Sequence, residues 1–253
     1  MTRSAKVWLV AVVAVVLLLI VALAPHGTEP DVPAARPGAS LSPEAVPTGG
    51  PSGAPTSAPS LTPGRHTALV VLATLPVKGK SPRTGYDRTG DFGRAWLDVD
   101  QNGCDTRNDI LARDLTQIVR SGTCRILSGV RIDPYTGKTI DFVRGQATSA
   151  LLQIDHIVPL ANAWQTGAQK LTQIQRVRFA NDPLNLLSVD GRANEQKSDG
   201  DAATWLPAVK AFRCSYVARQ ISVKAKYHLW VTPPERDAMQ RILSRCPTQP
   251  AYT

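Results

Sequence analysis

The sequence predicts an α+β domain, for three reasons. The segment 133–137 contains Pro and Gly turn signals between two segments of strand character, which predicts a β-hairpin. Several longer segments place apolar residues at the intervals typical of helices. A strand at 151–158, a second strand at 184–189 and a helix starting at 191–197 follow one another, with an excursion between the two strands.

The remaining elements follow from the same patterns. The stretch 68–75 is compatible with a helix or a strand, and 86–96 is rich in turns. Helices are expected at 109–119, 171–179, 191–197, 208–227 and 233–243, the last with Pro234 in its first turn. Strands are expected at 124–132, 139–143, 151–158 and 184–189.

The N-terminal residues predict export. Two basic residues, Arg3 and Lys6, precede an unbroken apolar run at 7–24, which is typical of a signal peptide or of a single membrane span. Pro25 disfavours cleavage directly after this run, which favours an uncleaved anchor. Either segment at 1–24 predicts a protein that is secreted or anchored to the outer face of the cytoplasmic membrane, where the anchor would be its membrane contact.

Residues 25–64 form the next region of distinct composition. They are mostly Pro, Ala, Ser, Gly and Thr, with almost no large apolar side chain. Such a segment cannot bury enough apolar surface to offset the entropy lost on ordering. We therefore expect a disordered, partly extended linker at 25–64 and one folded domain at 65–253.

Four cysteines fit an exported protein, because an even number in an oxidising compartment is more often disulfide-bonded than metal-bound. Three pairings are possible, and we favour the sequence-local ones, Cys104 with Cys124 and Cys214 with Cys246. A zinc site made by all four thiolates is the alternative, although the sequence contains no C-x-x-C pair. The formal charge of +9 favours polyanionic partners such as nucleic acid, or an anionic membrane surface, without deciding between them.

Candidate chemistry begins with Asp155 and His156 inside an apolar strand, where polar side chains are costly to bury. Adjacent residues of a regular strand point to opposite faces, so a bulge or the end of the strand would be needed to bring both to one site. An internally satisfied pair would explain this dipeptide if it stood alone. Two asparagines, Asn185 and Asn194, follow in the second strand segment and in the next helix.

These segments together resemble the HNH endonuclease family. The resemblance rests on 155–160 (DHIVPL), 185–187 (NLL) and 194–197 (NEQK), and it is closest to the exported bacterial branch whose last motif residue is Asn. The upstream stretches 86–88, 96–98 and 104–108 also resemble that branch. The resemblance implies a ββα-metal (HNH/His-Me finger) nuclease motif, with its core at 151–206, embedded in a disulfide-stabilised domain.

The resemblance also implies roles that phosphodiester hydrolysis needs. His156 would be the general base, because a neutral imidazole can take a proton from water. Asp155 and Asn194 would hold one divalent metal ion, Mg²⁺ before Mn²⁺, since carboxylate and amide oxygens suit hard ions better than zinc. Asn185 would brace the loop between the strands and orient His156.

Further side chains have two readings each. Lys197 and Arg192, within one turn of Asn194, would either bind substrate phosphates or form a solvated basic face. Trp164 and Trp205 would stack on bases or, as we favour, belong to the core. The segment 98–109 resembles a calcium loop, but its last ligand position is Asp109 rather than Glu and Cys104 lies in its interior. A tight turn stabilised by Asx hydrogen bonds is therefore favoured there.

The sequence thus predicts an extracellular metal-dependent endonuclease that hydrolyses DNA with low sequence specificity. RNA is a second possible substrate, and no small-molecule cofactor is implied. Two alternatives belong to other classes. One is a catalytically silent protein that binds nucleic acid or the cell wall, and the other is a calcium-dependent interaction module of the cell surface.

Overall fold

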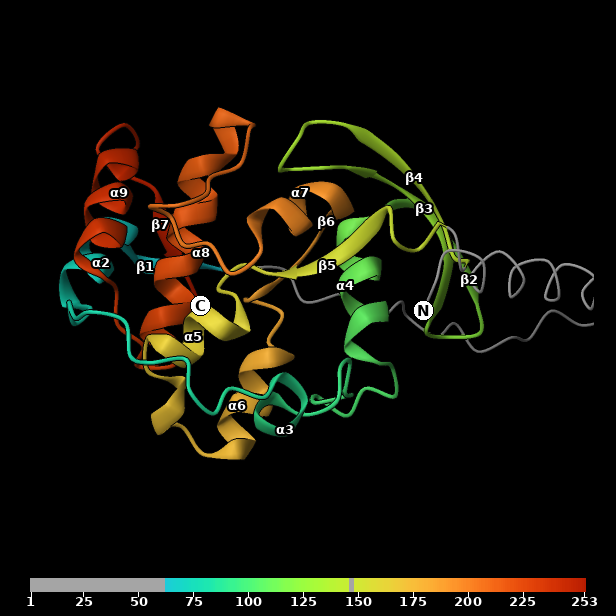
Figure 1. The fold of residues 1–253 in the computed structure, drawn as a ribbon. Coiled ribbons are helices and arrows are strands. Elements are labelled where there is room, and N and C mark those ends of the chain that lie inside the picture. The colour runs from blue at the N-terminus through green and yellow to red at the C-terminus, as the bar shows by residue number, and fades with distance from the viewer. Residues whose placement is uncertain (1–61, 146–147) are drawn as a thin grey trace, which may run out of the picture. The chain divides into compact units, whose positions relative to one another are not determined.

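A computed structural model describes residues 62–145 and 148–253 (Figure 1). The predicted signal peptide or anchor at 1–24 lies outside these residues, as does the predicted linker up to residue 61. No helix within the described part of the chain is long and apolar enough to cross a bilayer. The first strand, β1 (Pro63–Thr67), begins two residues before the predicted start of the domain, because it pairs with β7 (Pro250–Tyr252) near the C-terminus.

The fold is α+β, as predicted. Its longer helices are α2 (Ala68–Thr74), α3 (Arg88–Phe92), α4 (Thr106–Asp114), α5 (Leu160–Gln165), α6 (Gln173–Ala180), α7 (Gly191–Lys197), α8 (Arg213–Lys226) and α9 (Pro233–Leu243). The other strands are β2 (Thr116–Ser121), β3 (Arg125–Ile132), β4 (Thr139–Val143), β5 (Leu152–His156) and β6 (Leu186–Asp190). Antiparallel pairing produces the sheets β2-β3-β4, β5-β6 and β1-β7.

Most predicted elements are confirmed. The hairpin is formed by β3 and β4 around the turn at 133–137, where Gly137 has a φ of 78° that favours glycine. The strands β5 and β6 and the helices α6, α7 and α9 also lie where they are expected. The segment 68–75, which was compatible with either state, is the helix α2, because the Thr67 hydroxyl accepts a hydrogen bond from Val70 N and caps it.

Two helix boundaries correct the prediction. The helix predicted at 109–119 is α4, which ends at Asp114, and Ile118 and Val119 lie instead in β2. These β-branched residues favour strands, and Gln117 has a φ of 51° that no helix tolerates. The helix predicted at 208–227 starts only at Arg213, after a short 3₁₀ turn.

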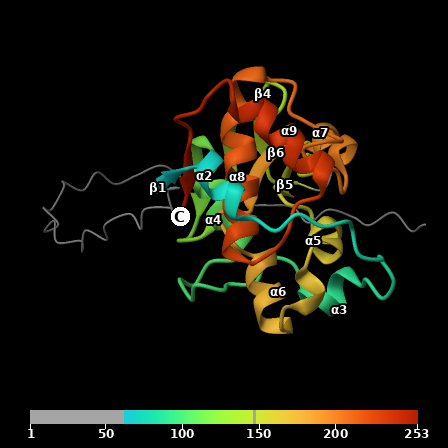
Figure 2. The ribbon, with the colours of Figure 1, turned by 90° about the vertical axis from the view of Figure 1, so that its left-hand side faces the viewer.

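Three hydrophobic clusters surround the β5-β6 pair. The largest is formed by α2, α8 and α9 and includes Tyr216, Ile221 and Met239. A second contains the aromatic side chains of α3 and α6, and a third lies between α4 and the sheet β2-β3-β4. Figures 1 and 2 show α8 next to α2 and α9, with β5-β6 on its other side.

This arrangement explains the apolar character of β5 and β6. Leu187 and Val189 of β6 contact the largest cluster, whereas Leu186 of β6 and Ile154 of β5 contact the cluster beneath α4. Strand neighbours point to opposite faces, so both faces of the pair are buried. The polar residues Asp155 and His156 therefore lie at the end of an otherwise buried strand.

Both favoured disulfides are present. Cys104–Cys124 connects the loop before α4 to the turn between β2 and β3, and Cys214–Cys246 connects the start of α8 to the segment after α9. With sequence separations of 20 and 32 between the paired cysteines, each bond is expected to stabilise the fold by about 3 to 4 kcal/mol through the entropy of the unfolded chain. Because all four sulfurs are bonded in pairs, the four-thiolate zinc site is excluded.

Candidate active site

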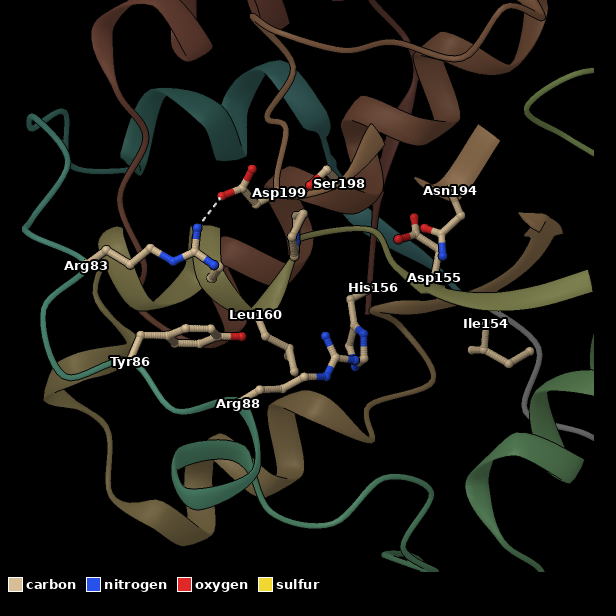
Figure 3. A pocket seen from close by; sticks show the side chains of 12 residues that line it. Arg83, Tyr86, Arg88, Ile154, Asp155, His156, Leu160, Asn194, Ser198 and Asp199 are labelled. Atoms are coloured by element: carbon tan, nitrogen blue, oxygen red, sulfur yellow. Dashed lines mark hydrogen bonds and ion pairs between the residues drawn. The ribbon is translucent and has the colours of Figure 1, made fainter. Parts of the chain in front are cut away.

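The strand β5 ends at the cavity and brings Asp155 and His156 to it together. Asp155 pairs with Leu187 and His156 with Leu186 in unbroken register, so no bulge is involved. The chain then leaves the sheet, and α5 begins after Pro159. Asp155, His156 and Asn194 line the same cavity of about 390 Å³ (Figure 3). The structure therefore brings the predicted base and both predicted metal ligands together.

His156 is held in one orientation. Its Nε2 lies 2.8 Å from the carbonyl oxygen of Ala180, and its ring lies parallel to Trp96. A carbonyl oxygen only accepts, so Nε2 carries the proton and Nδ1 is left as a free base. Burial lowers the pKa of His156 to about 4, against the opposing effect of the Ala180 hydrogen bond and with a further lowering by Arg88. His156 is therefore neutral at pH 7.

Asp155 is buried and accepts a hydrogen bond at each oxygen. The Tyr135 hydroxyl donates to Oδ2 at 2.5 Å, and the Lys197 ammonium donates to Oδ1 at 2.9 Å. Each oxygen keeps a further lone pair, so the carboxylate can still bind a cation. The hydroxyl of Tyr135 is fully buried, and burial followed by the charge of Asp155 raises its pKa well above the usual value. Tyr135 is thus a permanent donor to Asp155.

Lys197 does not lie where the predicted contact with a substrate phosphate requires. Its side chain is buried, with Nζ also 2.8 Å from the carbonyl oxygen of His156. The ammonium therefore points from α7 toward the end of β5 and not toward solvent. Arg192, the other predicted phosphate contact, is exposed on α7 and does not line the cavity. A substrate contact by either residue stays a prediction, and for Lys197 the geometry argues against it.

Asn194 is placed by an unusually close junction between β6 and α7. The Asp190 side chain caps α7 by accepting from Ala193 N at 2.8 Å. Gly191 follows at once, and a Cβ there would lie 2.1 Å from the Ala150 carbonyl oxygen, so only glycine fits. From α7, Asn194 Nδ2 donates to Gln153 Oε1 at 2.8 Å, which leaves its carbonyl oxygen free beside Asp155 (Figure 3).

The donor set fits one hard divalent ion. Asp155 offers carboxylate oxygens and Asn194 offers an amide oxygen, both of which suit Mg²⁺ or Mn²⁺. No group of three or more His, Cys, Asp or Glu side chains that could hold a metal occurs among the described residues. Water and substrate oxygens would therefore have to complete the coordination, as is usual for Mg²⁺.

Asn185 is fully buried and braces the chain that follows β5. Its Oδ1 accepts from Val158 N at 2.8 Å, and its Nδ2 donates to the carbonyl oxygens of Val158 and Phe179 at 3.3 and 3.5 Å. None of these side-chain hydrogen bonds goes to His156. Because Phe179 precedes Ala180, whose carbonyl oxygen bonds His156, the orientation of the imidazole depends on Asn185 through one intervening segment.

The partly buried Arg113 and the buried Arg219, which the sequence did not single out, hold the turn carrying Asn185. Arg113 donates to the carbonyl oxygens of Pro183 and Leu186 at 2.8 and 2.7 Å. Arg219 donates to the same Leu186 oxygen and to that of Leu184, both at 2.9 Å. These charge-assisted bonds satisfy carbonyl groups that the excursion between β5 and β6 leaves without a strand partner.

Arg88 is the functional candidate that sequence reasoning missed. Its side chain reaches from α3 into the cavity beside His156 (Figure 3), and it forms no ion pair with any described residue. Arg83 lines the same cavity but is paired with Asp199 at 3.2 Å. The only sequence signal for Arg88 was the resemblance of the stretch 86–88, which gave no role.

Other predicted features are structural. Trp164 and Trp205 pack against the hydrophobic clusters, as favoured. In the segment 98–109, Asp98 Oδ2 accepts from Gly103 N at 2.9 Å and Asn102 Oδ1 accepts from Cys104 N at 2.7 Å, which confirms the Asx-stabilised turn.

Comparison with known proteins gives a family and one relative. The family described as "GmrSD restriction endonucleases, C-terminal domain" matches residues 105–242. A protein of Arthroderma benhamiae described as an uncharacterized secreted protein is 36% identical over 186 residues, which cover 73% of this chain and 87% of that protein. No solved structure matches.

Proposed function

Because the chain belongs to the family of GmrSD restriction endonuclease C-terminal domains, we propose that it is a metal-dependent endonuclease that hydrolyses DNA, with His156 as the general base. The observation that carries the proposal is the neutral imidazole of His156, whose free Nδ1 shares a cavity with a carboxylate and an unpaired arginine. Phosphodiester hydrolysis needs a base for water, a cation for the phosphate and help for the leaving oxygen. All three are available in this cavity once a metal ion is bound.

Each residue has a role in this proposal. His156 Nδ1 accepts the proton of the attacking water, and Asn185 keeps the imidazole aligned through the Phe179–Ala180 segment. Asp155 and Asn194 hold one Mg²⁺ or Mn²⁺ ion in an HNH-type arrangement. When bound, that ion supplies positive charge for the scissile phosphate and the leaving 3′ oxygen, which leaves a 5′-phosphate end.

The proposed setting is extracellular. Two disulfides are typical of proteins that fold in an oxidising compartment. The secreted relative supports the same setting. We propose low sequence specificity, because nothing in the sequence resembles a separate specificity module.

The test uses the purified, oxidised protein with supercoiled plasmid DNA, and in parallel with RNA, in Mg²⁺, Mn²⁺, Ca²⁺ or EDTA. Nicking of DNA in Mg²⁺ and Mn²⁺ and none in EDTA is expected. Asp155→Asn is the matched variant, because it keeps the side-chain shape and removes the carboxylate, and it should lose the metal-dependent nicking.

The same experiment separates the alternatives. Folded protein that binds DNA but cleaves it in none of the metals would be a binding protein, and the enzyme proposal would be wrong. Calcium binding without any nuclease activity would identify an interaction module. Faster cleavage of RNA than of DNA would change the proposed substrate.

Arg88 is expected to bind the scissile phosphate. Replacing it by glutamine should lower kcat/KM for DNA by about 100-fold, because the cation is removed from the place where charge develops. Arg83→Gln is the matched control, since Arg83 lines the same cavity but is already paired with Asp199, and this replacement should lower kcat/KM by less than about tenfold. An Arg88→Gln variant with nearly parental kcat/KM would show that the phosphate is bound elsewhere.

A further inference from the structure

The buried ammonium of Lys197 is the feature of the site that the proposed chemistry does not use. The residue is 2% exposed, and Nζ lies 2.9 Å from Asp155 Oδ1 and 2.8 Å from the His156 carbonyl oxygen. Burying an ammonium group is costly unless it is paired and hydrogen-bonded. Asp155 is its only ion-pair partner among the described residues. The negative charge of Asp155, which would attract a metal ion, is therefore already paired with the ammonium of Lys197.

The charges around the cavity have a net positive sign. The ion pair of Lys197 with Asp155 and that of Arg83 with Asp199 each sum to zero. Arg88 adds one positive charge that is not paired with any described residue. Such a cavity attracts a phosphate and repels a free divalent cation.

We propose that Lys197 is a positioning residue that couples entry of the metal ion to binding of DNA. It fixes the carboxylate of Asp155 and cancels its charge, so that a divalent ion binds weakly to the free protein. The phosphate of the substrate supplies the missing negative charge and the missing oxygen ligands. This inference rests on the proposed function. It adds that DNA and the metal ion bind cooperatively, so that each raises the affinity of the protein for the other.

Linkage makes the proposal quantitative. If DNA raises the affinity for the ion by a given factor, the ion must raise the affinity for DNA by the same factor. Both affinities can be measured without turnover in a His156→Ala variant, which keeps Lys197 and Asp155. The DNA-free and DNA-bound affinities for the same ion then measure the coupling directly.

Tyr135 provides a matched control for the charge of Lys197. Its hydroxyl donates to the other oxygen of Asp155 at 2.5 Å but carries no charge. Tyr135→Phe therefore frees one carboxylate oxygen without changing the net charge. Lys197→Met also frees one oxygen and in addition removes the positive charge beside it. Lys197→Gln serves as a second variant that keeps a hydrogen-bond donor.

The experiment measures binding of Mn²⁺ alone by electron paramagnetic resonance, with and without a short DNA duplex. In the His156→Ala background, DNA should raise the Mn²⁺ affinity at least tenfold. Lys197→Met or Lys197→Gln should raise the DNA-free affinity by about tenfold or more, whereas Tyr135→Phe should change it by less than threefold. The melting temperature of the Lys197 variants should rise on addition of Mn²⁺, whereas that of the parent should not.

Several results would overturn the inference. One is an equal affinity of His156→Ala for Mn²⁺ with and without DNA. Another is a DNA-free affinity of Lys197→Met for Mn²⁺ that is no higher than that of Tyr135→Phe. If both Lys197 variants fail to fold, the affinity of His156→Ala for Mn²⁺ with and without DNA still shows whether DNA and the ion bind cooperatively. A parent that cleaves DNA yet binds Mn²⁺ tightly by itself contradicts the inference and leaves the function intact. A parent that does not cleave DNA contradicts the proposed function. The increase in DNA-free affinity for Mn²⁺ on replacing Lys197 still tests the inference in that case.

Discussion

Replacement of His156 by alanine is expected to lower the rate of DNA cleavage by about 1,000-fold, with the fold preserved. The free Nδ1 of this imidazole is the group in the cavity best placed to take a proton from water, because Nε2 is bonded to the Ala180 carbonyl. Single-turnover nicking of plasmid DNA measures the effect. His66→Ala, at an exposed position in β1, is the control and should cleave at the parental rate. A His156→Ala rate within tenfold of the parent would exclude His156 as the base.

The pH dependence follows from the pKa of His156. Because burial lowers this pKa from 6.5 to about 4, the base stays deprotonated between pH 8 and pH 6, and its titration should not reduce cleavage in that range. In the unfolded chain the same imidazole takes up a proton near pH 6.5. As the pH falls from 6.5 to about 4, the unfolded state therefore binds more protons, and the fold loses on the order of 3 kcal/mol. His156→Ala should lack this part of the pH dependence in urea titrations.

Glu235→Ala is expected to be the most destabilising of the single replacements considered. The carboxylate of Glu235 is fully buried and lies 2.8 Å from the ammonium of Lys224, which is also buried. It also accepts from Thr232 N, which completes the capping box of α9. Removal leaves an unpaired buried charge, which costs about 3 to 5 kcal/mol. Urea denaturation of the oxidised protein measures the loss.

Two further variants separate the causes of that loss. Glu235→Gln keeps an acceptor for Thr232 N and removes only the charge, so it should lose most of the same free energy. The double replacement Lys224→Met with Glu235→Leu removes both charges and should recover much of it. A loss below about 1 kcal/mol for Glu235→Ala would mean that Lys224 finds enough compensation in the Trp230 carbonyl and the Asn162 side chain.

The sequence predicts those parts of the fold that depend on local patterns. The hairpin around 133–137 and the order of β5, β6 and α7 were found because turn residues and apolar periods are local signals. The strand β2 was missed for the opposite reason. Its residues at 116–121 continue the apolar spacing of α4, and only pairing with β3, which begins further along the chain, makes them a strand.

The candidate site shows the same division. The motif residues Asp155, Asn185 and Asn194 were found because the resemblance marks them. The burial of Lys197 was not predictable, since its position on α7 shows which turn it occupies but not that the end of β5 lies over it. Arg88 reaches His156 from a segment far away in sequence, and no local pattern reports that contact.

The junction between β6 and α7 determines where the chain can change length. Asp190 ends the strand and caps the helix, so no spare residue separates the two elements. One inserted residue there would rotate the rest of α7 by about 100° and turn Asn194 and Lys197 away from Asp155. Lys170 is an exposed residue of the 3₁₀ turn in the excursion between β5 and β6, so an insertion beside it would leave the β6-α7 junction unchanged. Length variation among relatives is therefore expected in the excursion and not at the junction.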